Sequence, residues 1–181
     1  MNNIVLIGMP GAGKSTTGII LAKTIGYEFV DTDILIQNQE KKILQDIIDQ
    51  AGIEKFLEIE EKIILANNFS NCVIATGGSV VLSEKAMHHL GALGKIIYLE
   101  LSLETINKRI DNIKTRVIVL DNNQTLQDVY NARTPYYKKY AEFILDCENK
   151  TLENIIDDIV KLTRLLQTNK KLWKKNQHLT R

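Results

Sequence analysis

The residues whose types and spacing best suit chemistry lie at positions 8–15, which read Gly-Met-Pro-Gly-Ala-Gly-Lys-Ser. This stretch matches the phosphate-binding pattern G-x-x-x-x-G-K-[ST], in the required place between a predicted strand and a predicted helix. Glycines allow backbone N–H groups to curl around a phosphate, and a helix N-terminus directs its positive end at the same anion. We expect Lys14 to reach the β- and γ-phosphates of ATP and the Ser15 hydroxyl to bind Mg²⁺. The alternative, a glycine-rich turn that binds nothing, is disfavoured because motif and context agree.

Two aspartates, in the sequence Asp31-Thr32-Asp33, follow a short apolar segment that predicts a second strand. Beside a P-loop, one carboxylate could hold Mg²⁺ through water, and the other could accept a proton from an incoming hydroxyl. The alternative is structural, because Thr32 or Asp33 could simply cap the helix that is expected to follow. The neighbouring P-loop favours the catalytic interpretation.

Two further features suggest an acceptor site. Residues 76–79 (Thr-Gly-Gly-Ser) follow a third predicted strand, where glycines let the backbone approach a ligand closely. Arg116 lies in a stretch without clear periodicity, and Arg133 lies in a predicted helix. An arginine in a mobile lid can close over the transferring phosphoryl group, and a second arginine can bind an acceptor carboxylate through two hydrogen bonds. Taken singly, the glycines fit an ordinary turn and each arginine fits a solvated surface position.

Apolar runs and helical segments alternate along the chain, which predicts an α/β fold. The predicted strands lie at residues 4–7, 29–30, 73–75, 95–101 and 143–145. Strands joined through helices form a parallel sheet with helices on both faces, here a three-layer sandwich with five strands. Such sheets bind ligands beyond the carboxyl ends of their strands, where the P-loop, the two aspartates and the glycine pair all fall.

The length of 181 residues fits one domain, which we place at residues 1–166, with a lid at about residues 112–124. Residues 167–181 form a basic tail that contains no acidic residue. The simplest interpretation of this tail is a solvated chain end, and the alternative is a basic helix that docks on an acidic partner.

The composition argues against several classes of protein. The 23 basic and 22 acidic residues leave a net charge of +1, so no global field indicates binding to nucleic acid or to a membrane. No apolar segment approaches the length of a membrane span, and the N-terminus has no pattern of a signal peptide. The two cysteines are far apart in sequence and suit a reducing compartment. We therefore expect a cytoplasmic enzyme, and we expect a monomer.

Together these motifs resemble the shikimate kinase family over nearly all of residues 1–166. The resemblance rests on the P-loop, Asp31-Thr32-Asp33, Gly52, Phe56, Glu60, Gly77-Gly78, Arg116, and Arg133-x-Pro135-x-Tyr137 with Ala141. That family transfers the γ-phosphoryl group of ATP to the 3-hydroxyl of shikimate, in aromatic amino acid biosynthesis. Its fold is similar to that of the nucleoside monophosphate kinases, with a five-stranded parallel sheet, a lid and a mobile acceptor-binding region.

The resemblance implies a role for each residue of the site. The nucleotide-binding residues would be Gly11, Ala12, Gly13, Lys14, Ser15 and Thr16, with Arg116 from the lid and Lys150 on the adenine side. Ser15 would bind Mg²⁺, and Asp31 would assist through water. Asp33 would hold and deprotonate the acceptor hydroxyl, so that Lys14, Asp33 and Arg116 would carry catalysis. Gly78 would bind the acceptor through its backbone, and Arg133 would bind the acceptor's carboxylate.

Three positions depart from the family pattern. Leu57 stands where the pattern Phe-Arg-x-x-Glu has an arginine that binds the carboxylate of shikimate. Ser79 replaces the last of three glycines, and the lid sequence Arg-Pro-Leu-Leu reads Arg-Val-Ile-Val at residues 116–119. The changes in the lid and at the third glycine could be drift. Losing one hydrogen bond to a charged group, worth about 1.5–3 kcal/mol, would weaken shikimate binding by about 10- to 100-fold.

Three interpretations therefore compete. The first is a shikimate kinase in which Arg133 and other groups compensate for the missing arginine. The second is a sister kinase that acts on a different small alcohol or sugar acid. The third is a nucleotide-binding regulator with little catalysis, which the intact Lys14, Ser15 and Asp33 argue against. The family resemblance favours the first, and a nucleoside monophosphate kinase is disfavoured because the basic residues needed around an acceptor phosphate are not evident.

Overall fold

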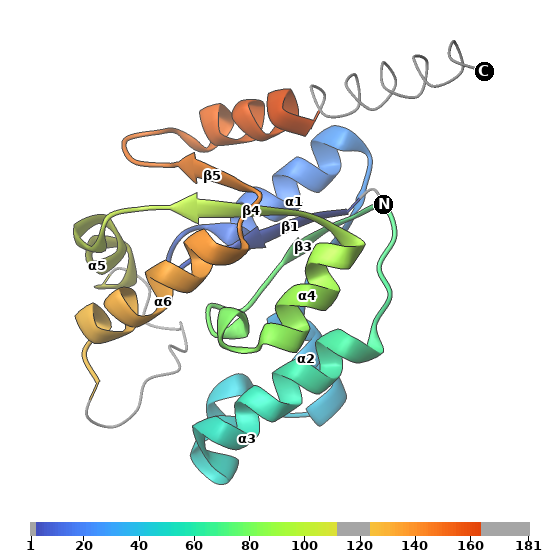
Figure 1. Cartoon of the computed structure of the whole chain (residues 1–181), viewed down its shortest axis with the longest axis vertical. Coiled ribbons are helices and arrows are strands. Elements are labelled where there is room, and N and C mark those ends of the chain that lie inside the picture. Colours follow the sequence, from blue (N-terminus) through green and yellow to red (C-terminus); the bar gives the residue numbers. More distant parts are fainter. Residues whose placement is uncertain (1–2, 112–123, 164–181) are drawn as a thin grey trace. The chain divides into compact units, whose positions relative to one another are not determined.

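The computed structural model describes residues 3–111 and 124–163, and it confirms the predicted α/β fold (Figure 1). Five parallel strands form one sheet in the order β2-β3-β1-β4-β5. The strands are β1 (Asn3–Ile7), β2 (Glu28–Asp31), β3 (Cys72–Ala75), β4 (Gly94–Glu100) and β5 (Phe143–Asp146). Their ends differ from the predicted ends by no more than one residue.

Helices follow the strands as the alternating pattern predicts. They are α1 (Lys14–Ile25), α2 (Thr32–Glu40), α3 (Leu44–Ala66), the short 3₁₀ helix η1 (Val80–Leu82), α4 (Glu84–Leu93), α5 (Leu103–Asp111) and α6 (Leu126–Tyr140). Gly26 ends α1 in the left-handed conformation, with φ of 73°. Lys41 ends α2 with φ of 55°, and Gly52 kinks α3 with φ of 81°.

The chain divides into two compact units, Met1–Glu148 and Asn149–Arg181. The sheet and the elements named above belong to the first unit, and the described part of the second contains a helix over residues 152–163. The single domain expected over residues 1–166 stays a prediction. The lid predicted at about residues 112–124 lies, except for Gln124, outside the described residues, as does the tail at 167–181.

Burial explains why the central strands consist of apolar residues. Every residue of β1 and β3 is buried, whereas the edge strands β2 and β5 are partly exposed. Helix α1 packs against β1 and β3, and α4 and α6 pack against β4. In Figure 1, α1 lies on one side of the sheet and α4 and α6 lie on the other, so the central strands are covered on both faces. Strands buried in this way read as continuous apolar runs.

Parallel pairing aligns the carboxyl ends of the strands that precede the candidate site. Leu6 of β1 pairs with Ala75 of β3, and Ala75 pairs with Asp31 at the end of β2. The loops that follow these three strands therefore leave the sheet at the same edge. This register brings the P-loop, the two aspartates and the glycine pair to one place.

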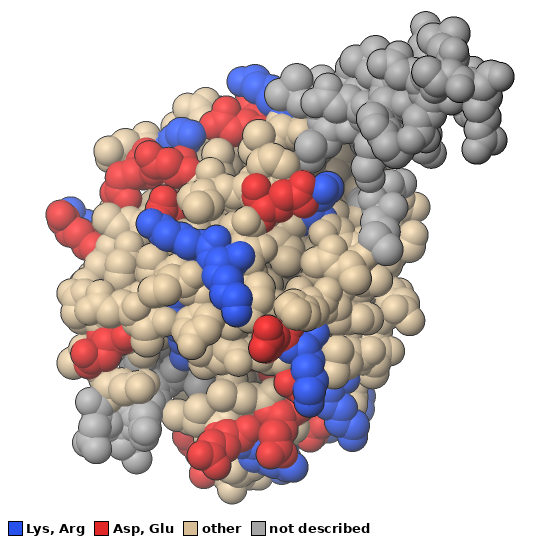
Figure 2. All heavy atoms as spheres, in the orientation of Figure 1, with Lys and Arg blue, Asp and Glu red and all other residues tan. Residues whose placement is uncertain are grey.

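No helix in the described part of the chain is long and apolar enough to cross a membrane. Acidic and basic side chains are interspersed over the face of the molecule shown in Figure 2, which fits the net charge of +1. The field of this surface is therefore mixed in sign rather than directed at one kind of charged partner.

Asn3 joins three segments at the opposite edge of the sheet. Its side chain is buried, and its Nδ2 donates to the carbonyl oxygens of Phe69 at 2.7 Å and Leu93 at 3.0 Å. Its Oδ1 accepts from the N–H of Cys72 at 2.9 Å. One amide therefore satisfies the backbone at the start of β3 and just before β4, next to its own strand.

We expect Asn3→Ala to lower the free energy of unfolding by about 2–4 kcal/mol, because one buried and two partly buried backbone groups lose their hydrogen-bond partners. Asn131→Ala, on the exposed side of α6, is the matched control and should change it by about 0.5 kcal/mol or less. Urea denaturation of both variants measures the difference. Equal losses in the two variants would contradict this role of Asn3.

Candidate active site

The P-loop has the backbone geometry that its glycines predict. Gly8, Gly11 and Gly13 have φ of 148°, 88° and 92°, values that residues with a side chain rarely adopt. Gly13 takes the N-cap position of α1 and has no side chain with which to cap it, so the first backbone N–H groups of the helix are available to an anion. The buried Lys14 curls over the loop, where its Nζ donates to the carbonyl oxygens of Gly8 at 2.7 Å and Met9 at 3.0 Å.

Ser15 and Asp31 meet beside this loop. The Ser15 hydroxyl donates to Oδ2 of Asp31 at 2.6 Å, and Oδ1 of Asp31 accepts from the N–H of Asp33 at 3.0 Å. Asp31 is therefore the N-cap of α2. The alternative interpretation of the sequence had assigned this cap to Thr32 or Asp33. A hydroxyl and a carboxylate at this place suit Mg²⁺, which usually takes few protein ligands and fills its octahedron with phosphate oxygens and water. The described residues contain no cluster of three or more His, Cys, Asp or Glu side chains that could bind a metal by themselves.

The loop after β3 fits tightly between the P-loop and the ends of α2 and α3. The N–H of Gly77 donates to Oγ1 of Thr32 at 3.0 Å. A Cβ on Gly78 would lie 2.8 Å from Cδ of Pro10, and a Cβ on Gly77 would lie 2.5 Å from Oε1 of Glu60. Both distances are shorter than a real Cβ contact, so a side chain at Gly78 would collide with the Pro10 ring, and one at Gly77 would displace the carboxylates of Glu60 and Asp33. The loop thus brings the predicted acceptor-binding Gly78 against the P-loop.

Helix α6 brings Arg133 to the same loop. Arg133 and Tyr137 lie one turn apart on one face of the helix, and both side chains are buried. The Tyr137 hydroxyl donates to the carbonyl oxygen of Gly78 at 2.6 Å, and its ring stacks on Tyr98 with centroids 5.1 Å apart. Burial raises the pKa of Tyr137, so its hydroxyl stays protonated and can donate this bond. The buried Arg133 therefore lies one helical turn from the tyrosine that bonds Gly78.

Glu60 completes this cluster from α3. Its side chain is only 2% exposed, and its Oε2 accepts from the Ser79 hydroxyl at 2.8 Å. Oε1 has no hydrogen-bond partner among the described residues. A Cβ placed on Gly77 would lie 2.5 Å from this oxygen and 2.9 Å from Oδ1 of Asp33, so the two carboxylates approach the same point. Burial raises the pKa of Glu60 to about 7, and the bond from Ser79 opposes this rise. Asp33 raises this pKa further, whereas the positive charge of Arg133 lowers it.

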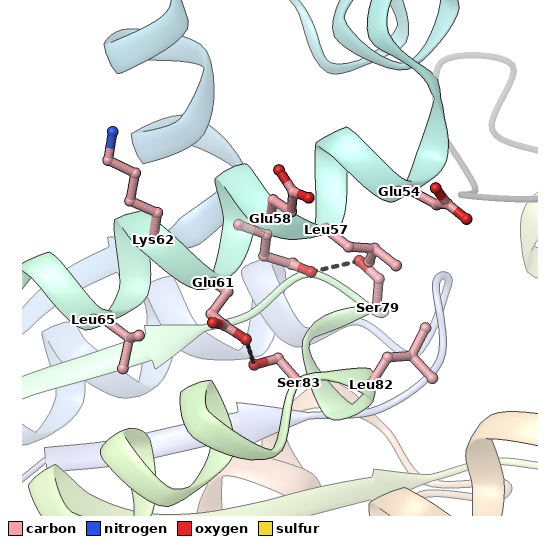
Figure 3. Close-up of a pocket in the computed structure, with 10 residues that line it drawn as sticks. Glu54, Leu57, Glu58, Glu61, Lys62, Leu65, Ser79, Leu82 and Ser83 are labelled. Carbon is pink, nitrogen blue, oxygen red and sulfur yellow. Dashed lines mark hydrogen bonds between the residues drawn. The ribbon is translucent and has the colours of Figure 1, made fainter.

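A cavity of about 460 Å³ opens on the other side of Ser79 (Figure 3). Helix α3 forms one wall and the segment around η1 forms the other. The lining residues are Glu54, Leu57, Glu58, Glu60, Glu61, Lys62, Leu65, Ser79, Leu82 and Ser83. Leu57 also packs, partly buried, against the apolar core between α2 and α3. The wall at position 57 is therefore apolar, and the cavity around it is rich in glutamates.

Most of the site residues predicted from the sequence lie together in the first unit. The P-loop residues 11–16, Asp31, Asp33, Gly78 and Arg133 surround one edge of the sheet. Arg116 lies outside the described residues. Lys150 belongs to the second unit, where its Nζ pairs with Asp158 at 2.9 Å.

Two contributions to the site were missed by the sequence analysis. Arg109 of α5 donates to the carbonyl oxygen of Ala12 at 3.4 Å and lies beside Gly13, so a second cation adjoins the P-loop. Its position follows from the pairing of β4 with β1, which the alternation of elements does not reveal. Ser79, which could have been drift, provides a hydrogen bond to the buried Glu60.

Comparisons with known proteins agree with this geometry. Residues 10–164 match the family described as Shikimate kinase. The shikimate kinase of Clostridium botulinum (strain ATCC 19397 / Type A) is 39% identical over 161 residues, 86% of this chain and 93% of the relative. That of Caldanaerobacter subterraneus subsp. tengcongensis is 34% identical over 164 residues, 89% of this chain and 95% of the relative.

A solved structure of shikimate kinase from Acinetobacter baumannii in complex with shikimate is similar over 94% of this chain and 95% of that chain, with a TM-score of 0.83 and 27% identity. The sequence match and the structural match thus both cover most of the chain. The chain therefore belongs to the shikimate kinase family and is a phosphotransferase of that family.

Proposed function

We propose that this protein transfers the γ-phosphoryl group of ATP to a hydroxyl of shikimate, with Mg²⁺ as the metal. The observation that carries the proposal is the position of Gly78. It lies against Pro10 of the P-loop while its carbonyl oxygen accepts from Tyr137, one helical turn from Arg133. This arrangement supports a site in which Arg133 binds the acceptor carboxylate near the P-loop, which binds the phosphates of the nucleotide.

The residues of this chain divide the work in a definite way. Bound ATP and Mg²⁺ supply the phosphoryl group and the counter-charge for its oxygens. Lys14, which now donates to two loop carbonyls, is positioned to exchange these bonds for the β- and γ-phosphates. Ser15 would hold the metal, and Asp31, which accepts from the Ser15 hydroxyl, would orient that hydroxyl and assist in holding the metal. Arg109 adds positive charge on the α5 side of the loop.

Asp33 is the proposed proton acceptor for the attacking hydroxyl. Its backbone N–H is fixed by Asp31, and its Oδ1 points to the space beside Gly77. A carboxylate held in this way can orient a hydroxyl and take its proton, an effect worth about 10²–10⁴ in rate. Arg133 is the proposed ligand of the acceptor carboxylate, and Arg116 the proposed lid arginine.

The acceptor is the part of the proposal that most needs a test. Apolar Leu57 and four glutamates line the cavity beside Ser79, so this wall has no arginine with which to bind the acceptor carboxylate, and the proposal assigns that role to Arg133. Release of ADP should therefore be compared with shikimate, quinate, gluconate and nucleoside monophosphates. We expect turnover with shikimate. Turnover with another compound of the panel and none with shikimate would overturn the proposed acceptor but not the kinase chemistry.

We expect Lys14→Ala to reduce kcat by about 10²–10³-fold at saturating ATP, because the transferring phosphate loses a directed positive charge. Lys23→Ala, near the exposed end of α1, is the matched control and should leave kcat unchanged. Melting curves of both variants check that the fold is retained. A folded Lys14→Ala protein with normal turnover would show that this loop does not bind the reacting phosphates.

We expect Leu57→Arg to lower KM for shikimate by about 10-fold or more, because a guanidinium at this position adds one charged hydrogen bond to the acceptor carboxylate. The new side chain would also give Oε1 of Glu60 a partner, since both residues line the same cavity. Leu65→Arg adds the same charge elsewhere on α3 along that cavity, so it should leave KM unchanged. An equal change in both variants would mean that the gain is a general effect of charge.

A further inference from the structure

Only one of the two carboxyl oxygens of Glu60 has a hydrogen-bond partner in the described part of the chain. One oxygen accepts from the Ser79 hydroxyl at 2.8 Å, and the other has no hydrogen-bond partner among the described residues. A buried carboxylate needs hydrogen bonds or a cation to remain charged, so the single neutral donor does little to hold Glu60 ionised. The neutral acid needs fewer donated hydrogen bonds, because it carries no charge and only one of its oxygens is purely an acceptor.

Charged groups of both signs face Glu60 from the elements around it. Asp33 of α2 approaches the same point beside Gly77, and its carboxylate opposes ionisation of Glu60. Lys14 at the start of α1 and Arg133 of α6 favour ionisation. Tyr137 of α6 is buried and stays neutral.

The next acidic residue of α3 and a lysine of α4 pair with each other. On α3 itself the next residue, Glu61, accepts from the Ser83 hydroxyl at 2.6 Å. Glu61 also pairs with Lys85 of α4 at 3.4 Å, so this lysine is directed away from Glu60. Arg133 is therefore the cation through which an acceptor carboxylate and Glu60 most directly affect each other.

We propose that the ionised Glu60 competes with the carboxylate of the acceptor for the positive charge of Arg133, and that Glu60 takes up a proton from solvent when such an acceptor binds. The inference rests on the proposed function, because it needs an acceptor that carries a carboxylate. Residues 77 and 78 link the two groups, since Gly77 packs against Glu60 and Gly78 accepts from Tyr137 on the helix of Arg133. With the acceptor bound, three carboxylates (Glu60, Asp33 and that of the acceptor) face the two cations Arg133 and Lys14, which leaves one negative charge in excess.

The direction of the effect follows from linkage. Burial raises the pKa of Glu60 to about 7, so both protonation states are populated near neutral pH. A bound carboxylate adds negative charge beside Arg133 and raises this pKa further. Reciprocally, protonation of Glu60 must favour binding of the carboxylate, and its ionisation must weaken it. The affinity for shikimate should thus fall as the pH rises above 7, by up to about 10-fold per pH unit.

Titration calorimetry of shikimate into the full chain, in two buffers of different ionisation enthalpy, measures the proton uptake. At pH 7 we expect about half a proton per molecule bound, as for a group with a pKa of about 7 that becomes fully protonated. Glu60→Gln keeps the size of the side chain but cannot ionise, so uptake should vanish and the affinity should lose its pH dependence between pH 6 and 8. Glu104→Gln, at an exposed glutamate of α5 that does not line the cavity, should retain both effects.

Two further measurements separate this role from a structural one. Ser79→Ala removes the bond that favours the ionised form, so the fall in affinity should move to higher pH. The methyl ester of shikimate has no negative charge, so any binding of the ester should proceed without proton uptake.

The possible failures are distinct. If shikimate binds without proton uptake, or if Glu60→Gln leaves the uptake intact, the inference is wrong and the proposed function stands. If the folded wild-type chain turns over ATP with another acceptor and does not bind shikimate, the proposed acceptor is wrong, and this inference fails with it.

Discussion

The close approach of the chain at Gly77 and Gly78 is the constraint on which the site depends. A side chain on Gly78 would collide with Pro10 of the P-loop, and one on Gly77 would collide with the carboxylates of Glu60 and Asp33. Without these two glycines, the nucleotide side and the acceptor side of the site would be pushed apart. Reacting groups must be held near contact distance for phosphoryl transfer, so a small displacement here would be costly. The segment is held on both sides, because the N–H of Gly77 donates to Oγ1 of Thr32 and the Tyr137 hydroxyl donates to the carbonyl oxygen of Gly78.

Local patterns in the sequence predicted much of the fold. The strands follow from apolar runs such as residues 4–7, because a strand buried on both faces has no polar side to alternate with. The kink at Gly52 suits a glycine, because its φ of 81° is one that residues with a side chain rarely adopt. Strand order was not predictable, because it depends on packing between segments far apart in sequence. This is why Arg109, which reaches the P-loop from the helix after β4, was not identified.

The short motifs of the site were predicted from the sequence, but the contacts between residues far apart in the chain were not. The P-loop and Asp31-Thr32-Asp33 are short motifs whose chemistry depends on residues next to one another, so the sequence displays them directly. Glu60 is different, because it lies among Glu58 and Glu61 in a helix, a pattern typical of an exposed face. Its burial is a consequence of tertiary packing, and its partner Ser79 is 19 residues away, beyond β3. The helix cap at Asp31 was also misassigned, because Thr32 and Asp33 are equally common N-cap residues.

The differences at Leu57 and Ser79 have one electrostatic consequence when they are considered together. A guanidinium at position 57 would be a charged partner for Glu60, and a cation close to a buried carboxyl holds its pKa down. Ser79 instead offers a neutral hydroxyl, which satisfies one oxygen but adds no positive charge. Glu60 therefore keeps a pKa of about 7, because burial outweighs the bond from Ser79. With Leu57 apolar, Arg133 is the buried guanidinium in the described acceptor side, and it must balance Glu60, Asp33 and any anionic acceptor. The charge state of Glu60 thus decides how much of that positive charge the acceptor can use.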